Sequence, residues 1–377
     1  MAGIYIHIPF CHKACNYCDF HFSTSLNNKD DLLRCLLKEL EQRRNEINTS
    51  VSSIYFGGGT PSVLTINEIK QLIDQCFEHY KILDDLEVTL EANPEDISIE
   101  LINEYAKAGI NRLSIGVQSF QDNVLEWMNR SHSSKQAIDC INWANQAGIT
   151  NISVDLIYGV PEELQRNWSQ DLETLLSLNV KHISAYNLTV EEKTVLHKLV
   201  KEKKQLMPDQ DICNDAYDLL VQTLKLAGFE QYEVSNFSKK GFQSRHNSAY
   251  WHRAPYLGIG PSAHSFNGQK TRSWNVSNNR QYIKQIDSGI CTFETEELTD
   301  LDIANEIILL GTRTKKGVSI NKVLKYLNTQ QKDVFLKQLD ELKKKRFIIT
   351  NDDHLYVNED KRFYSDHISR ELIILPT

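Results

Sequence analysis

Hydrophobic residues recur along the first half of the chain in two alternating patterns. Short runs rich in β-branched and aromatic residues predict strands at 3–8, 53–57, 86–91, 112–117, 151–157 and 181–186. Between these runs, apolar positions repeat with helical spacing over 29–46, 65–80, 98–108, 121–128, 133–147 and 167–178. Six successive βα units predict an α/β fold, a partial or complete (βα)6 barrel built on a parallel sheet.

The pattern changes in the second half of the chain. A helical stretch over 209–227 is followed by a segment rich in Asn, Ser, Gly and aromatic residues, and then by helical patterns near 299–313, 319–327 and 331–345. A β-hairpin is expected around 351–354. We therefore expect a core barrel over 1–230, a loop-rich connector over 231–295, and a mostly helical, winged-helix-like module over 296–377.

Polar residues and glycine turns follow each predicted strand. The first strand leads to the segment CHKACNYC, the second to GGGTP, the third to Glu91 and the fourth to Gln118. The fifth strand carries Asp155, and the sixth ends at Tyr186 and Asn187. In an α/β barrel the carboxyl ends of the strands meet on one face, where active sites are built. The sequence thus predicts one site that collects these residues.

Composition and charge exclude several classes of protein. Of the 377 residues, 41% are hydrophobic and 24% are charged, which is typical of a globular protein. A net charge of −8 argues against a nucleic-acid-binding protein, and the basic runs at 201–204 and 343–346 are interpreted as solvated helix ends. We find no transmembrane-length apolar run and no secretory signal in MAGIYIHIPF, so the expected location is cytoplasmic.

Three of the eight cysteines form a cluster. Cys11, Cys15 and Cys18 have the spacing CxxxCxxC, whereas Cys35, Cys76, Cys140, Cys213 and Cys291 are scattered and are interpreted as ordinary core or surface residues. Three thiolates from one loop can hold an iron–sulfur cluster and leave one iron open to another ligand. A zinc site completed by His7, His12 or His21 is the alternative. The position after the first strand, without a second Cys/His pair, favours the cluster.

The segment from Tyr5 to Cys11, with Cys15, Tyr17 and Cys18, resembles the signature of radical S-adenosylmethionine enzymes. More narrowly, it resembles the oxygen-independent coproporphyrinogen III oxidase group, and the resemblance continues through GGGTPS (57–62), LEANPE (90–95), RLSIGVQSF (112–120) and DLIYGVP (155–161). It implies a [4Fe-4S] cluster held by Cys11, Cys15 and Cys18, with S-adenosylmethionine on the open iron. By the same resemblance, the cofactor site is lined by Tyr5, Tyr17, Gly58, Gly59, Thr60, Glu91, Gln118, Arg130 and Asp155. Without this context, the glycines would be an ordinary turn and the carboxylates caps or solvated groups.

Two branches of this group differ at features that the chain displays. The dehydrogenase branch carries a fourth cysteine two residues after the third, and an N-terminal extension. Here that position is Phe20 and Cys11 lies near the start, so the chain resembles the other branch, the HemW haem chaperones. Their HNxxYW motif is matched by His246, Asn247, Tyr250 and Trp251.

An imidazole is a good axial ligand for haem iron, and aromatic rings can cover a porphyrin face. The motif therefore implies a site for haem b. His252 and His264 are alternative ligands, and a packed aromatic cluster around a hydrogen-bonded histidine is the structural alternative.

The sequence thus yields a leading hypothesis and two alternatives. The leading one is a radical-S-adenosylmethionine-type haem chaperone that binds a [4Fe-4S] cluster, S-adenosylmethionine and haem, and transfers haem to acceptor proteins, respiratory or membrane-associated ones among the candidates. The first alternative is an enzyme that oxidatively decarboxylates coproporphyrinogen III to protoporphyrinogen IX. The second is a zinc-stabilised α/β protein. The resemblance assigns no catalytic residue, and no nucleic-acid partner is expected.

Overall fold

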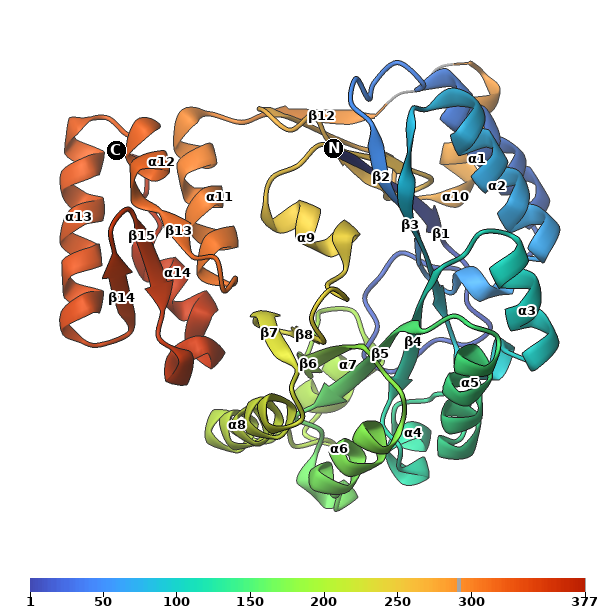
Figure 1. Ribbon diagram of the computed structural model, residues 1–377, viewed down its shortest axis with the longest axis horizontal. Coiled ribbons are helices and arrows are strands. Elements are labelled where there is room, and N and C mark those ends of the chain that lie inside the picture. Colours follow the sequence, from blue (N-terminus) through green and yellow to red (C-terminus); the bar gives the residue numbers. More distant parts are fainter. Residues whose placement is uncertain (290–292, 377) are drawn as a thin grey trace.

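The barrel is built from six parallel strands that lie side by side in chain order (Figure 1). The computed structural model describes residues 1–289 and 293–376, so Cys291 lies outside the described residues. The strands are β1 (Ala2–Ile8), β2 (Val51–Gly58), β3 (Ile82–Ala92), β4 (Arg112–Gln118), β5 (Asn151–Tyr158) and β6 (His182–Asn187). Each begins within four residues of its predicted start. The α/β barrel prediction is confirmed.

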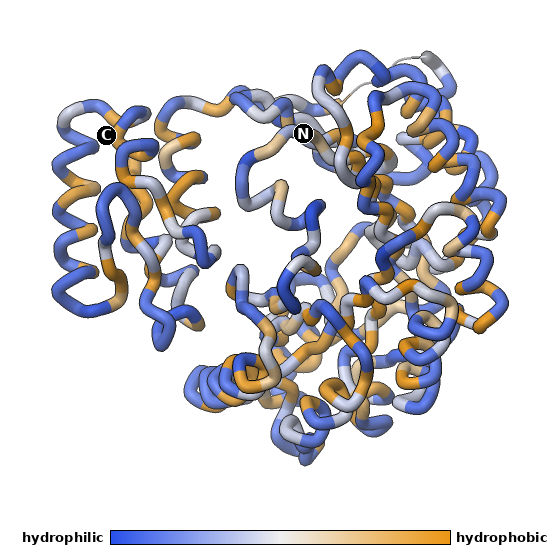
Figure 2. Tube along the Cα trace, in the orientation of Figure 1, coloured by the Kyte–Doolittle hydropathy of each residue, from blue (hydrophilic) through white to orange (hydrophobic). Residues whose placement is uncertain are grey.

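Helices follow these strands and cover the outside of the sheet (Figure 1). They are α1 (Lys29–Gln42), α2 (Ile66–His79), α3 (Ile99–Lys107), α4 (Asp122–Trp127), α5 (Ser134–Gln146) and α6 (Trp168–Ser177), with short 3₁₀ turns at Pro61–Val63, Pro94–Asp96 and Glu162–Leu164. Thr65 caps α2 and exchanges hydrogen bonds with Glu68, and Ser98 caps α3. Figure 2 shows hydrophobic and hydrophilic positions alternating along these helices, as one buried face requires.

Further strands extend the sheet at both edges. β9 (Tyr256–Ile259) pairs in parallel with β1, and β10 (His264–Phe266), β11 (Thr271–Trp274) and β12 (Glu294–Glu297) continue antiparallel from it. At the other edge, β8 (Asn236–Ser238) pairs with β6, and β7 (Glu230–Glu233) pairs with β8. The sequence led us to expect a loop-rich connector over 231–295, and short strands of the same sheet lie within this segment, separated by longer loops and helices.

Helix α9 (Arg245–Trp251) carries the HNxxYW motif and packs against the first halves of β1 and β2. Its His246 lies against Gly3 and Ser53, near the amino-terminal ends of these strands. The cysteine segment follows the opposite, carboxyl-terminal end of β1. The motif and the cysteines therefore lie toward opposite ends of the barrel strands.

The C-terminal module has a hydrophobic core of its own, which includes Ile308, Phe335 and Leu355. Helices α7 (Val195–Lys201), α8 (Gln210–Leu226) and α10 (Asn279–Asp287) complete the barrel side. The module contains α11 (Asp300–Thr312), β13 (Val318–Ser319), α12 (Ile320–Lys325), α13 (Thr329–Lys344), β14 (Ile348–Asn351), β15 (His354–Val357), a 3₁₀ turn at Glu359–Tyr364, and α14 (Ser365–Leu372). Helices α11, α12 and α13 and the hairpin match the predicted positions, whereas α14 was not predicted. None of the helices in the described part of the chain has the length and apolar character needed to cross a bilayer.

Candidate functional site

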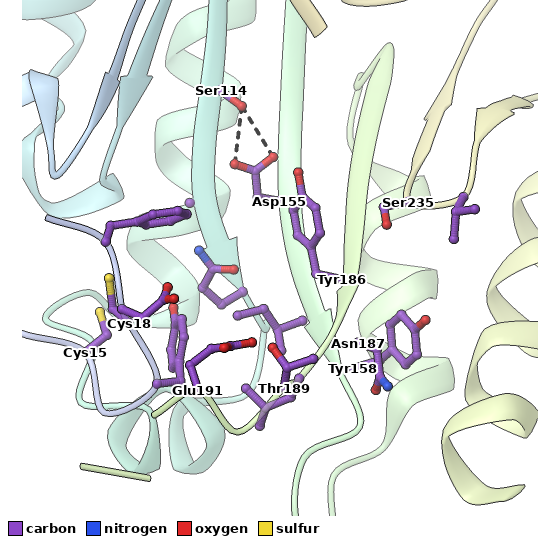
Figure 3. Close-up of a pocket in the computed structure, with 18 of the residues that line it drawn as sticks. Cys15, Cys18, Ser114, Asp155, Tyr158, Tyr186, Asn187, Thr189, Glu191 and Ser235 are labelled. Carbon is purple, nitrogen blue, oxygen red and sulfur yellow. Dashed lines mark hydrogen bonds between the residues drawn. The ribbon is translucent and has the colours of Figure 1, made fainter. Parts of the chain in front are cut away.

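A cavity of about 1280 Å³ opens at the carboxyl ends of the barrel strands. Figure 3 shows Cys15 and Cys18 at one side of it, with Asp155 and Tyr186 on neighbouring strands. Most residues that the sequence assigns to the cofactor site line this one cavity, namely Cys11, Cys15, Cys18, Tyr17, Gly58, Gly59, Thr60, Glu91, Gln118, Arg130 and Asp155. The loops of all six parallel strands contribute to it, as the barrel geometry requires.

The cysteine loop, residues 11–23, is closed by a hydrogen bond between its ends, and two of its thiols lie beside polar groups. The Cys11 amide donates to the Ser23 carbonyl (3.0 Å), which brings the two ends of the loop together. The Thr60 hydroxyl donates to Cys11 Sγ (3.4 Å), and Arg130 Nη1 donates to Cys15 Sγ (3.3 Å). Burial raises the pKa of Cys18 to about 11. Donors aimed at the sulfurs stabilise the thiolate form that binds iron.

The donor set fits an iron–sulfur cluster better than a single zinc ion. Within residues 1–289 and 293–376, no three His, Cys, Asp or Glu side chains converge closely enough to hold one metal ion. A zinc ion needs all its ligands within about 2.0–2.3 Å of one point. A four-iron cluster offers a separate iron to each thiolate, so Cys11, Cys15 and Cys18 need not converge. The three thiols line one cavity together, which suits the cluster.

The glycine turn after β2 leaves room for the cysteine loop. A Cβ on Gly59 would lie 2.6 Å from the Phe10 carbonyl oxygen and 3.0 Å from Cys11 Sγ. Gly58 has a φ of +112°, and a Cβ there would lie 2.6 Å from the His7 ring. The turn is therefore a close contact between two loops of the site, and a side chain at either position would displace the cysteines.

Replacing Gly59 with alanine will lower the iron content of the anaerobically purified protein. The added methyl group pushes against Phe10 and Cys11, and overpacking of this kind costs about 1–3 kcal/mol of unfolding free energy. Iron and sulfide per chain, with the absorbance of the cluster, measure the effect. Gly241→Ala is the control, because a Cβ there meets no atom within 4 Å although its φ is +85°. Wild-type iron content in Gly59→Ala would contradict the role of this turn.

Two carboxyl groups from β3 and β5 line the cavity. Glu91 accepts hydrogen bonds from the Tyr55 hydroxyl (2.7 Å) and the Gly58 amide (3.2 Å), and burial raises the pKa of Glu91 to about 7. Asp155 accepts from the Ser114 hydroxyl (3.2 Å and 3.3 Å; Figure 3), and burial raises its pKa as well. Because burial penalises their charged forms, both carboxylates gain from a cationic ligand.

Arg130 connects the cysteine loop to β3 and β4. Besides Cys15, it donates to the Asn93 side-chain oxygen (2.6 Å) and to the Gly116 carbonyl (2.8 Å). Gln118 follows with a φ of +66°, in the left-handed region that non-glycine residues rarely adopt. These contacts fix the loop after β4 against the cysteines.

The remaining predicted site residues lie elsewhere. His246 is only 2% exposed, and both its ring nitrogens are engaged, Nδ1 with the Ser53 hydroxyl (2.9 Å) and Nε2 with the Tyr250 hydroxyl (2.8 Å). Burial lowers the pKa of His246 to about 3. The Asn247 backbone amide donates to the Ser244 hydroxyl oxygen (3.2 Å), and the Arg313 guanidinium lies over the Trp251 ring at 5.6 Å.

Tyr5 and Tyr250 line a second cavity of about 450 Å³. This cavity lies between the barrel, β9–β11 and α11, and it is also lined by Phe20, the second residue after Cys18. The Phe20 side chain is 68% exposed and lines both cavities. His264 lines the second cavity, whereas His252 lines neither.

Several residues of the larger cavity were not found by sequence reasoning. Asn93 lies two positions after Glu91 at the same strand end. This proximity to a predicted site residue could have identified Asn93 as a member of the site. The C-terminal module contributes a group that no local pattern indicated, namely Arg313, Phe347, Lys361, Phe363, Tyr364, Asp366, His367 and Arg370. Their approach to the barrel depends on how the two parts pack.

The chain was compared with known proteins. A model of the radical SAM superfamily matches residues 5–175, and one of the HemN C-terminal domain matches residues 298–362. The chain is 34% identical to the heme chaperone HemW of Bacillus subtilis over 98% of both chains. It is 31% identical to HemW of Haemophilus influenzae over 97% of this chain and 96% of that protein.

The comparison with solved structures supports the fold. Coproporphyrinogen III oxidase (HemN) from Escherichia coli superposes with a TM-score of 0.84 at 23% identity, over 99% of this chain and 90% of that one. At this identity the likeness extends to the architecture, that of a radical SAM fold with a C-terminal helical module.

Proposed function

The chain belongs to the HemW family of the radical SAM superfamily, and from this premise we propose that it is a cytoplasmic haem carrier. In this proposal it binds a [4Fe-4S] cluster, S-adenosylmethionine and haem b, and passes haem to acceptor proteins. The observation that carries the proposal is the similarity to proteins named heme chaperone along almost the whole chain.

Cys11, Cys15 and Cys18 would hold the cluster in the larger cavity. When bound, the cluster supplies electron-transfer chemistry and an iron open to a further ligand. Thr60 and Arg130 donate to two of the sulfurs and so favour their deprotonated form.

The chain's own groups beside the cysteines suit S-adenosylmethionine, which carries a positive sulfonium and an ammonium group. Gly58 and Gly59 allow backbone groups to approach a ligand without obstruction by a Cβ. Glu91 and Asp155 provide carboxyl groups for positive charge, and the carboxyl end of β4 places Gln118 in the same cavity.

The porphyrinogen-oxidising enzyme is the alternative from the sequence. The sequence identity to HemN is 23%, and a structural likeness at this identity shows a shared fold only. It therefore does not favour the oxidation of coproporphyrinogen III. Phe20 occupies the position of the fourth cysteine expected in the dehydrogenase branch, and its ring lies exposed between the two cavities. An exposed aromatic ring there suits contact with a flat ligand or a partner protein.

We expect an anaerobic titration of the full chain with haem to saturate near one haem per chain. The absorbance in the Soret region measures the binding. A single saturable site is expected because a carrier must hold its cargo stoichiometrically before it releases it. Turnover of coproporphyrinogen III is measured on the same cluster-loaded preparation. Absence of saturable haem binding, or turnover of the porphyrinogen, would overturn the carrier function.

A further inference from the structure

Aromatic side chains form the walls of the second cavity. Tyr250 and Tyr256 meet edge to face with ring centroids 4.5 Å apart, and Tyr256 lies 6.2 Å from Phe266. The cavity volume of about 450 Å³ lies within the range of about 300–1,000 Å³ that is usual for small-ligand sites. Walls of this kind favour a ligand with a flat aromatic body.

The same cavity carries an excess of positive charge. Arg253 and Arg272 both line it, and both pair with the single carboxylate of Glu306, Arg253 through Nη1 at 2.7 Å. Their guanidinium groups lie over the Phe266 ring at 5.2 Å and 5.8 Å. Two arginines against one glutamate leave a net charge of plus one among these three groups, which suits a ligand that carries carboxylates.

Three histidines line the cavity, and one of them has a ring free of hydrogen bonds. His7 contacts the Tyr5 hydroxyl through Nδ1 (3.2 Å) and the His21 carbonyl through Nε2 (3.0 Å), and His21 contacts Asn279 (2.7 Å). His264 is exposed and stacks on Trp274 with ring centroids 5.6 Å apart. Among the residues that the structure describes, none forms a hydrogen bond with the His264 ring, so a nitrogen lone pair is available to a metal.

The backbone around His264 is built for a close crossing of two strands. A Cβ on Gly258 would lie 2.1 Å from the His264 carbonyl oxygen, so β9 and β10 approach each other only because this residue is glycine. The β10–β11 pairing places Trp274 opposite His264 and thereby fixes the ring against its neighbour. The histidine is thus held by its strand and its stacking partner.

We propose that haem binds in this second cavity with His264 as an axial ligand to its iron, an inference that rests on the carrier function proposed above. The aromatic walls contact the porphyrin, and Arg253 and Arg272 face its propionates. The HNxxYW motif contributes Tyr250 to the wall. His246 acts through Tyr250 as a positioning residue, since its Nε2 holds the Tyr250 hydroxyl and its ring is buried.

The test compares histidine variants of the full chain by anaerobic haem titration, with the Soret spectrum and the electron paramagnetic resonance of ferric haem as readouts. His264→Ala will lose the signature of imidazole ligation and bind haem about tenfold or more weakly. Free imidazole will restore the signature in His264→Gly, because it fills the space of the missing ring. His246→Ala and His252→Ala will keep the wild-type signature.

The outcomes separate this site from the carrier function. A wild-type chain without saturable haem binding would overturn both. Saturable binding with an unchanged ligation signature in His264→Ala would leave the carrier function standing and overturn this site. Loss of the signature in His246→Ala alone would assign the ligand to the HNxxYW histidine.

Arg272→Gln will weaken haem binding about tenfold while the ligation signature stays. Unchanged affinity would contradict the contact between Arg272 and a propionate. The matched control is Arg34→Gln, whose exposed ion pair with Asp287 involves no residue lining this cavity.

Discussion

Replacing Cys15 with serine will remove almost all of the iron–sulfur cluster from the anaerobically purified protein. Loss of a residue that merely supports a metal ligand typically costs about 10–100-fold in metal affinity, and loss of a direct ligand will cost at least as much. A serine hydroxyl also stays protonated where a cysteine thiol ionises. Arg130 Nη1, which donates to the Cys15 sulfur, would face a neutral hydroxyl in its place.

Iron, sulfide and visible absorbance per chain measure this result. Cys213→Ser is the matched control, because Cys213 is a cysteine of helix α8 that does not line the larger cavity, and its replacement will leave the iron content unchanged. Full cluster content in Cys15→Ser, or equal loss in both variants, would remove Cys15 from the ligand set.

Replacing Asp171 with alanine will lower the free energy of unfolding by about 3–5 kcal/mol, because it leaves the Arg166 charge buried without a partner. The side chains of Arg166 and Asp171 are 5% and 0% exposed. Asp171 also accepts hydrogen bonds from the Ser119 hydroxyl (2.8 Å) and the Phe120 amide (3.1 Å). Arg166 in turn donates to the Gln118 carbonyl (3.2 Å), so the pair ties helix α6 to the end of β4, where Gln118 lines the cavity.

Urea unfolding measures the loss of stability. The control is Lys70→Ala, which breaks an ion pair with Asp74 whose side chains are 55% and 61% exposed. An exposed pair of this kind contributes about 0.3–0.5 kcal/mol. A loss in Asp171→Ala as small as that of the control would show that the buried network does not hold the loop.

The cysteine site illustrates how far the sequence led. The strand that leads to Cys11 and the strands that carry Glu91 and Asp155 were visible as apolar runs, and the rule that parallel strands end on one face then placed these residues together. The same reasoning did not reach Asn93, because an asparagine after a strand has many ordinary uses. The family resemblance, not this reasoning, assigned Tyr5 to the cofactor site, and Tyr5 lines the second cavity.

The histidines show what sequence spacing leaves undetermined. His246 belongs to the recognisable motif, and His264 belongs to no motif at all. His246, on α9, is buried against β2 with both ring nitrogens in hydrogen bonds. The His264 ring is exposed and lines the second cavity. Whether an imidazole has a free lone pair depends on its neighbours in space, which for His246 include Ser53, almost two hundred positions earlier in the chain.

The sequence by itself determined the barrel strands, the helices with their caps, the C-terminal helical module and the clustering of the cysteines, because hydrophobic periodicity and local hydrogen bonding act over a few residues. Only the tertiary structure decided the second cavity and the part that the C-terminal module takes in the first. These features arise where surfaces far apart in the chain pack together, as Tyr5, Tyr250 and Glu306 do in the second cavity. Burial, and with it the pKa of His246 and the freedom of His264, is a property of that packing.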